Sequence, residues 1–171
     1  KDLAYVMKVQ KEITHLGRIS ALLGWDQQTH MPKKGLQGRA EQGAYLSSLI
    51  HEKVISDDFF NAIKRLMKAN LSGDEKIMIE RLFKDVSKAR KLPKEFIQEI
   101  SLATTKGFST WLEAREKDDF KIFEPYLEKI VELKKKEAKY IGLEGHPYNS
   151  LLDSFEEGMT VEKLIKRRAG K

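Results

Sequence analysis

The spacing of apolar residues along the chain has the period of α-helices almost throughout. In residues 1–31, apolar positions recur at steps of three and four, and Pro32 must end the helix they form; the stripe comprises Val6, Val9, Ile13, Leu16, Ser20 and Leu23. The same spacing predicts further helices over about residues 36–52, 57–67, 74–91, 93–117 and from 123 onward, and Thr160 caps the start of a seventh. No segment has the alternation of a β-strand. The pattern predicts an all-α protein of about six to seven helices in antiparallel hairpins.

The composition agrees with a helical, globular chain and excludes several kinds of chemistry. The 171 residues include 4 prolines and 11 glycines, and 34% of them are charged. The absence of cysteine excludes disulfides, thiolate metal ligands and a catalytic cysteine, and it favours a reducing, cytoplasmic location. No apolar run approaches the length of a membrane span, so we expect no membrane partner.

The positive net charge is concentrated at the C-terminal end. Of the formal +6, residues 162–171 contribute +4, because they contain five bases and one acid. Elsewhere bases and acids are interleaved at helical spacing, which is not the concentrated stripe that nucleic acid requires. We therefore expect no nucleic-acid partner, although a helical nucleic-acid binder that uses this tail stays open as a weaker alternative. Residues 1–164 are predicted to form one helical region, and residues 165–171 a frayed or truncated basic tail.

Histidine spacing predicts no metal site within the chain. The segment "HEKVI" begins the zinc-peptidase pattern HExxH at His51, but Ile55 occupies the place of the second histidine, so a solvent-facing histidine at a helix end is the favoured interpretation. Asp26 and His30 lie four residues apart and could provide two ligands on one helix face. A histidine beside a carboxylate at a helix end is the commoner reason for such a pair. The chain also has no P-loop, GxGxxG or GxSxG motif.

Asp26 is the residue that most needs a structural explanation. It lies three residues after Leu23 and four after Leu22, so it extends the apolar stripe and should be buried or half-buried. An ionised carboxylate in that position needs a partner, and Arg39 of the following helix is the nearest candidate across a short turn. The pair is either a clamp between two helices or part of a functional cleft, and the residues alone leave both open.

Several motifs, taken together and in order, resemble those of the thermostable, Taq-type metallocarboxypeptidases. The resemblance covers most of the chain, from about Leu16 to Leu164. It is carried by the segments "LLGWDQQTHMP", "GRAEQGAYLSSLIHEKV", "ARKLPKEFIQEIS", "WLEAREKDDFKIFEPYLEKIVELKKKEAKYIG" and "HPYNSLLDSFEEGMT".

The resemblance implies that the chain corresponds to the N-terminal helical portion of an enzyme that removes amino acids from peptide C-termini. The family's fold is helical with a deep cleft, and zinc, held by a later HExxH and a downstream glutamate, assists hydrolysis. Those ligands are absent from the 171 residues. We therefore expect no bound zinc and no activity from this chain alone, and His30 is not expected to be a ligand. The cleft wall is predicted to include Trp25, Asp26, Gln27 and Arg39.

Two expectations about partners follow. Peptides would be the substrates of the complete enzyme, and apolar helix faces left uncovered in this portion would favour a homo-oligomer. The alternative to an enzyme portion is a standalone helical protein-interaction module, such as a truncated paralogue, which would use those faces for a partner.

Overall fold

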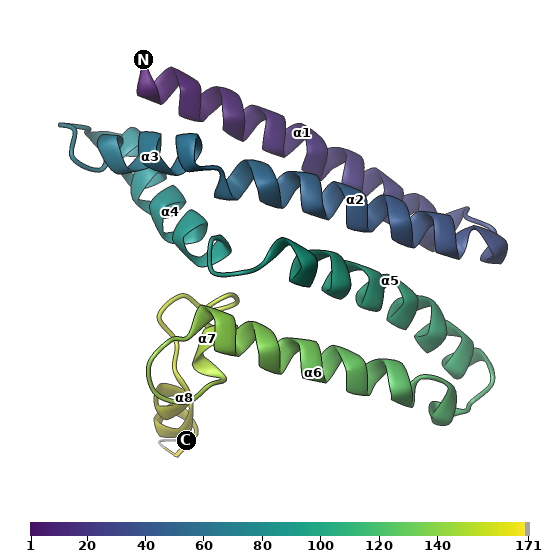
Figure 1. Cartoon of the computed structure of the whole chain (residues 1–171). Coiled ribbons are helices and arrows are strands. Elements are labelled where there is room, and N and C mark those ends of the chain that lie inside the picture. The colour runs from purple at the N-terminus through teal and green to yellow at the C-terminus, as the bar shows by residue number, and fades with distance from the viewer. Residues whose placement is uncertain (170–171) are drawn as a thin grey trace. The chain divides into compact units, whose positions relative to one another are not determined.

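The computed structural model describes residues 1–169, which form α-helices and two short 3₁₀-helices joined by loops (Figure 1). No strand occurs in this range, which confirms the all-α prediction. The elements are α1 (Asp2–Thr29), η1 (Lys33–Gly35), α2 (Leu36–Ile55), α3 (Asp57–Leu66), α4 (Gly73–Ala89), α5 (Lys94–Glu116), η2 (Phe120–Ile122), α6 (Glu124–Ile141), α7 (Asn149–Leu152) and α8 (Val161–Ala169).

The chain divides into two compact units, Lys1–Ser109 and Thr110–Lys171, and of the second unit the structure describes residues 110–169. The boundary falls within α5. The assignment of residues 1–164 to one helical region stays a prediction.

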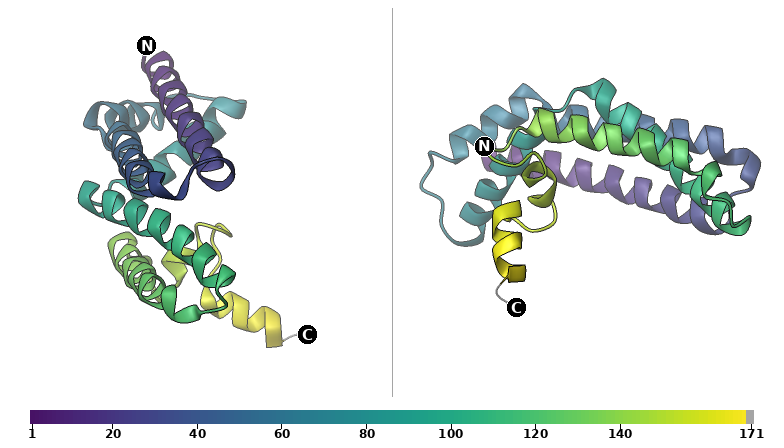
Figure 2. Two further views of the ribbon diagram at one scale, coloured as in Figure 1. Left: turned by 90° about the vertical axis from the view of Figure 1, so that its right-hand side faces the viewer. Right: turned by 90° about the horizontal axis from the view of Figure 1, so that it is seen from below.

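Helices α1 and α2 form an antiparallel hairpin, which both ribbon figures show (Figures 1 and 2). The α1 helix ends at Thr29 because Pro32 disfavours helical geometry at the residue before it. The turn is closed by the Gly35 backbone N–H, which donates to the Pro32 carbonyl over 2.8 Å. The short connection brings the end of α1 beside the start of α2.

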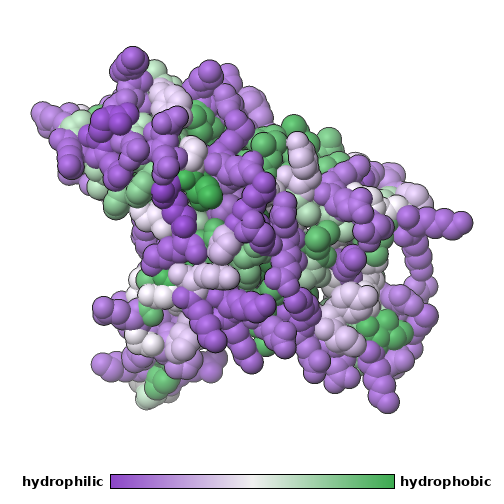
Figure 3. Space-filling view, viewed as in Figure 1, coloured by the Kyte–Doolittle hydropathy of each residue, from purple (hydrophilic) through white to green (hydrophobic). Residues whose placement is uncertain are grey.

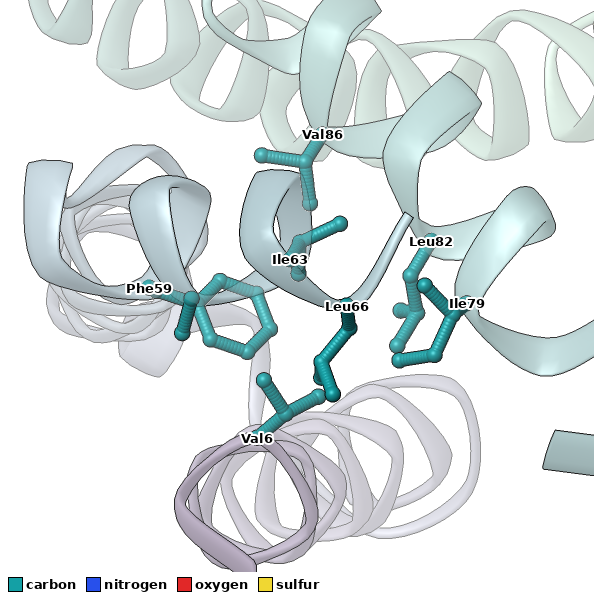
Figure 4. Packing of buried hydrophobic residues seen from close by; sticks show 8 residues of the cluster. Val6, Phe59, Ile63, Leu66, Ile79, Leu82 and Val86 are labelled. Atoms are coloured by element: carbon teal, nitrogen blue, oxygen red, sulfur yellow. The ribbon is translucent and has the colours of Figure 1, made fainter. Parts of the chain in front are cut away.

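The first unit has one hydrophobic core, built by α1, α3 and α4 (Figure 4). Val6 of α1 meets the inward face of α3, and α4 closes the cluster from the other side. The buried members are Val6, Phe59, Ala62, Ile63, Leu66, Ile79, Leu82 and Val86. Burying the larger of these side chains, from valine to phenylalanine, contributes roughly 1.5–3 kcal/mol each relative to leaving them in water.

Ion pairs tie the helices of this unit together at the surface. Arg65 of α3 donates two hydrogen bonds to the Asp2 carboxylate, at 2.6 and 3.0 Å, and this contact lowers the pKa of Asp2. Lys53 of α2 lies 2.8 Å from the Glu12 carboxylate of α1 and lowers the pKa of Glu12. Ser56 lies at the N-cap position of α3, but its hydroxyl donates to the Lys53 carbonyl and does not cap the helix.

Within the second unit, two buried polar side chains organise the long irregular segment after α6. The Asn149 side chain is 4% exposed; its Nδ2 donates to the Glu144 carbonyl and its Oδ1 accepts from the Val161 N–H. The Ser150 hydroxyl accepts from the Leu143 N–H. These bonds hold the start of α8 and the chain after α6 against α7.

Helix α8 includes residues 165–169 of the predicted basic tail, and the frayed or truncated state of that tail stays a prediction. The helix extends to Ala169 and is capped by Thr160, whose hydroxyl accepts from the Lys163 N–H. Basic side chains occupy its last turn, where they complement the partial negative charge of a helix C-terminus. The helix has no buried residue, and residues 170–171 of the predicted tail lie outside the described part of the chain.

The apolar steps from residue 123 onward predict that Tyr126, Val131 and Leu133 share one inward side of α6, and this prediction is partly wrong. Leu133 is fully buried, and Ala138 and Ile141 continue the buried face, whereas Tyr126 and Val131 are exposed. The inward face therefore lies further round the helix than the apolar positions suggest.

Among the described residues no helix is both long and apolar enough to cross a membrane. The face in Figure 3 is largely hydrophilic with smaller apolar patches.

Candidate functional site

The candidate site lies where the end of α1 meets the start of α2. Here Arg39 Nη2 lies 2.6 Å from Asp26 Oδ2. The Arg39 side chain is only 14% exposed and that of Asp26 37%, so the pair is partly withdrawn from water. The predicted partner of Asp26 is therefore confirmed, and the expectation of a half-buried carboxylate is confirmed with it.

Arg39 binds more of α1 than the carboxylate. Its Nη1 donates to the Leu23 carbonyl, and its Nε donates to the Gln42 side chain one turn further along α2, over 3.1 Å. The guanidinium uses its planar fork of donors to hold three acceptors at once, which a lysine could not do. This geometry fixes the angle at which the hairpin leaves its turn.

Trp25 and His30 form an exposed aromatic pair beside the clamp. Their ring centroids lie 5.0 Å apart with a tilt of 44°. The Thr29 hydroxyl donates to the Trp25 carbonyl over 2.8 Å, so its oxygen accepts from His30 Nδ1 at 2.7 Å. His30 is thus oriented by its neighbours in the last turn of α1.

The outer face of α1 carries large apolar side chains near the clamp. Trp25 is 57% exposed, Leu22 63% and Ile19 50%, while Gln27 is half-buried. The sequence places Leu22 and Leu23 together on the apolar stripe, but only Leu23 turns inward. Apolar residues spaced three and four apart cover a wide arc of the helix surface, so the residues at the edges of that arc reach solvent. The role of Trp25, Asp26, Gln27 and Arg39 in a cleft wall stays a prediction.

His51 is buried, which makes the expected solvent-facing position wrong. Its side chain is 6% exposed, and Nε2 donates to the Leu92 carbonyl over 2.8 Å. The neighbouring Glu52 pairs with Lys94 and raises the pKa of that lysine. Together the "HE" dipeptide fastens α2 to the segment that leads into α5. The burial of His51 is indicated in the sequence by the spacing of small residues before it. Ala40, Ala44 and Ser48 lie on the same face of α2 as His51, and this face is buried.

These residues do not fit a metal ion. Among residues 1–169 no three side chains of histidine, aspartate or glutamate come together as potential ligands. Asp26, the one carboxylate spaced to join His30, is engaged by Arg39, and His51 donates to a carbonyl. We therefore derive no metal chemistry from the residues of this chain.

Comparison with known proteins shows the family. A sequence model of the carboxypeptidase Taq (M32) metallopeptidase family matches residues 5–167. The chain belongs to this family. Thermostable carboxypeptidase 1 of Pyrococcus furiosus is 37% identical over 165 residues, which are 94% of this chain and 33% of that protein. Carboxypeptidase 1 of Bacillus subtilis is 37% identical over 156 residues, or 90% of this chain and 31% of that protein.

A solved structure described as "BsuCP Crystal Structure" has a TM-score of 0.94 to this chain at 34% identity, covering 99% of this chain and 34% of the other. The chain thus spans about a third of the length of the relatives it matches. This coverage agrees with the expectation that it corresponds to one helical portion of a metallocarboxypeptidase.

Proposed function

We propose that this chain supplies a helical wall of a zinc-dependent carboxypeptidase that removes single amino acids from peptide C-termini. The observation that carries the proposal is the family match over residues 5–167. It is supported by the TM-score of 0.94 to a solved relative, of which this chain covers 34%. In this proposal the Asp26–Arg39 clamp fixes the α1–α2 hairpin, and Trp25 and Gln27 face the cleft. Zinc belongs to the remaining two thirds of the enzyme, since the described residues offer it no ligand set.

The clamp can act on catalysis only through position. A cleft wall that shifts by about 1 Å can reduce turnover on the order of 100-fold, because reacting groups must be held in a narrow range of geometry. Arg39 holds three acceptors on two helices, so it is the positioning residue we assign to this wall.

A chimera tests the proposal. The third of Bacillus subtilis carboxypeptidase 1 that this chain matches is replaced by the chain, and release of C-terminal amino acids is measured with and without a zinc chelator. We expect chelator-sensitive release by the chimera, and none by the chain alone even with zinc added. A chimera that is helical and unfolds cooperatively but releases nothing would overturn the proposal, as would turnover by the chain alone.

A second candidate is a protein-interaction module that associates with a copy of itself, favoured by the exposed apolar residues of α1. Ile19, Leu22 and Trp25 follow one another at steps of three on the outer face of the helix. A contiguous apolar strip of this kind is typical of surfaces that are covered in an assembly. Sedimentation velocity distinguishes the outcomes: a dimer that Leu22→Glu dissociates supports this second function, and a monomer at all concentrations refutes it.

A reducing, cytoplasmic location completes the proposal, and the absence of cysteine supports it.

A further inference from the structure

The first half of α6 carries apolar side chains that are exposed to solvent. Tyr126 is 39% exposed, Leu127 36% and Val131 43%. Ile130, which lies among them, is half-buried. Steps of three and four residues place these side chains next to one another on one side of the helix. This spacing is typical of a helix face that is packed against protein, although here the residues contact water.

The same surface continues into the turn before α6. Phe123 is at the N-cap of the helix, three residues before Tyr126 and four before Leu127, so it belongs to the same side. The ring of Phe120, in η2, meets the Phe123 ring edge-on, with centroids 6.3 Å apart and planes at 80°, and Phe120 is 58% exposed. We call this surface the α6 apolar face, and its residues are Phe120, Phe123, Tyr126, Leu127, Ile130 and Val131.

The second half of α6 is covered by the chain itself. Leu133 is fully buried, and Ala138 and Ile141 are 6% and 4% exposed. The short helix α7 packs against α6, and the Ser150 hydroxyl accepts from the Leu143 N–H just after α6 ends, so the contact lies at this end of the helix. Residues 1–169 thus cover one end of α6 and leave the α6 apolar face exposed.

The opposite side of α6 argues against a membrane as the missing cover. It carries acids together with bases, namely Glu128, Glu132, Lys135 and Lys136. A helix that lies on an anionic membrane combines its apolar face with a polar face rich in lysine and arginine. Mixed charge is instead typical of the solvent side of a helix whose apolar side packs in a protein.

The relatives contain the additional protein that such a face needs. About two thirds of the length of each matched relative has no counterpart in this chain. Contiguous exposed apolar residues are typical of a surface that another part of an assembly covers. The unmatched part of the relatives is therefore the occupant that fits the α6 apolar face.

We propose that the α6 apolar face is the surface by which this chain packs onto the remaining two thirds of a carboxypeptidase of its family. The inference rests on the proposed function, and it adds the contact that joins the helical wall to the rest of the enzyme. It also explains why an apolar stripe that the sequence predicts to be buried is exposed in this chain.

The test compares two double variants of α6, each with two glutamines four residues apart. The face variant carries Leu127→Gln with Val131→Gln. The control variant carries Glu128→Gln with Glu132→Gln, at exposed positions on the opposite side. Both are made in the chain alone and in the chimera with Bacillus subtilis carboxypeptidase 1, and thermal unfolding is followed by circular dichroism.

In the chain alone, both variants should unfold within about 3 °C of the native chain, because substitutions at exposed positions change stability little. In the chimera, the face variant should lower the Tm by about 8 °C or more, since two amides replace apolar side chains in a buried contact. The control variant should change the Tm of the chimera by less than about 3 °C.

Equal Tm values for the face and control variants of the chimera would overturn the inference, as would a native chimera that does not unfold cooperatively. An equally large loss for the face variant of the chain alone would overturn it too, because the face would then be covered within the chain. Sedimentation velocity tests a second copy as the occupant: a dimer of the chain that the face variant makes monomeric would also overturn the inference.

The two proposals fail in different ways. An active chimera whose Tm does not depend on the α6 apolar face would refute only this inference. A cooperatively folded chimera that depends on the face and releases no amino acids would refute only the proposed function.

Discussion

Arg39→Met is the substitution for which the structure makes the sharpest stability prediction. Methionine preserves most of the apolar stem, so the change mainly removes the three hydrogen bonds that the guanidinium donates. The Leu23 carbonyl lies within α1, where helix geometry gives it a backbone donor, and the Gln42 side chain is exposed. The Asp26 carboxylate is the group that loses its main partner.

The size of the effect follows from how far Asp26 is buried. Removing one partner of a fully buried pair costs about 3–5 kcal/mol, because the other charge is left without water. Asp26 is 37% exposed and can regain water, so the lower range of about 1.5–3 kcal/mol for a hydrogen bond to a charged group applies. We therefore expect the free energy of unfolding to fall by about 2 kcal/mol, which lowers the Tm by about 4–8 °C for a chain of this size.

Urea unfolding followed by circular dichroism at the helix band measures this difference. The matched control is Arg18→Met, at an exposed arginine of α1, which should change stability by less than about 0.5 kcal/mol. Asp26→Asn completes a double-mutant cycle, in which the coupling energy with Arg39 should exceed about 1 kcal/mol. If the Arg39 and Arg18 variants unfold at the same urea concentration, the assignment of Arg39 as a clamp is refuted.

Three further predictions concern other contacts of the fold. His51→Leu leaves the Leu92 carbonyl without its donor and should lower the free energy of unfolding by about 1–3 kcal/mol, while His51→Gln, which can still donate, should lose less; equal Tm values for the two variants would argue against a structural hydrogen bond. The pKa values of Asp2 and Glu12 are lowered by Arg65 and Lys53, so the stabilisation is present above the ordinary carboxyl pKa of about 4 and is lost as the pH falls through the lower folded values. The Asp2→Asn, Glu12→Gln double variant should therefore show a flatter fall of Tm between about pH 5 and about pH 2 than the native chain, and an unchanged slope would contradict this origin. Gly142 ends α6 at φ 58°, where an added Cβ would lie 3.4 Å from the Lys139 carbonyl oxygen, so Gly142→Ala should destabilise by about 1 kcal/mol; Gly17→Ala, in the open interior of α1, should instead stabilise by up to about 1 kcal/mol, and urea midpoints that shift in the same direction would refute the distinction.

Most of the helices could be predicted from the sequence because local signals define them. Pro32 and the apolar steps before it fix the end of α1 within a few residues, and the short turn that follows leaves Arg39 close enough to pair with Asp26. The ion pair at the candidate site was predictable for the same reason: a half-buried carboxylate and a nearby arginine lie on either side of one hairpin.

The position of His51 could not be read from its own surroundings in the sequence. Its hydrogen-bond partner, Leu92, is 41 residues away, and no local pattern identifies that contact. The dipeptide begins a zinc motif that is not completed, whereas the small residues on the same side of α2 indicate that this face is turned inward. Burial of a histidine depends on what the facing segment offers, and that information is not local.

The structure of the segment between α6 and α8 also depends on contacts that no local sequence pattern identifies. Its structure depends on Asn149, whose amide bonds two backbone groups that lie five residues before it and twelve residues after it. Hydrophobic periodicity carries no information about such a residue, because a buried asparagine looks like an ordinary loop asparagine in the sequence. A buried polar side chain whose donors and acceptors are all hydrogen-bonded can hold a short irregular segment in a fixed shape without an apolar stripe. Apart from the exact inward face of a helix such as α6, the contacts that the sequence pattern does not predict are therefore those where a single buried polar group sets the geometry.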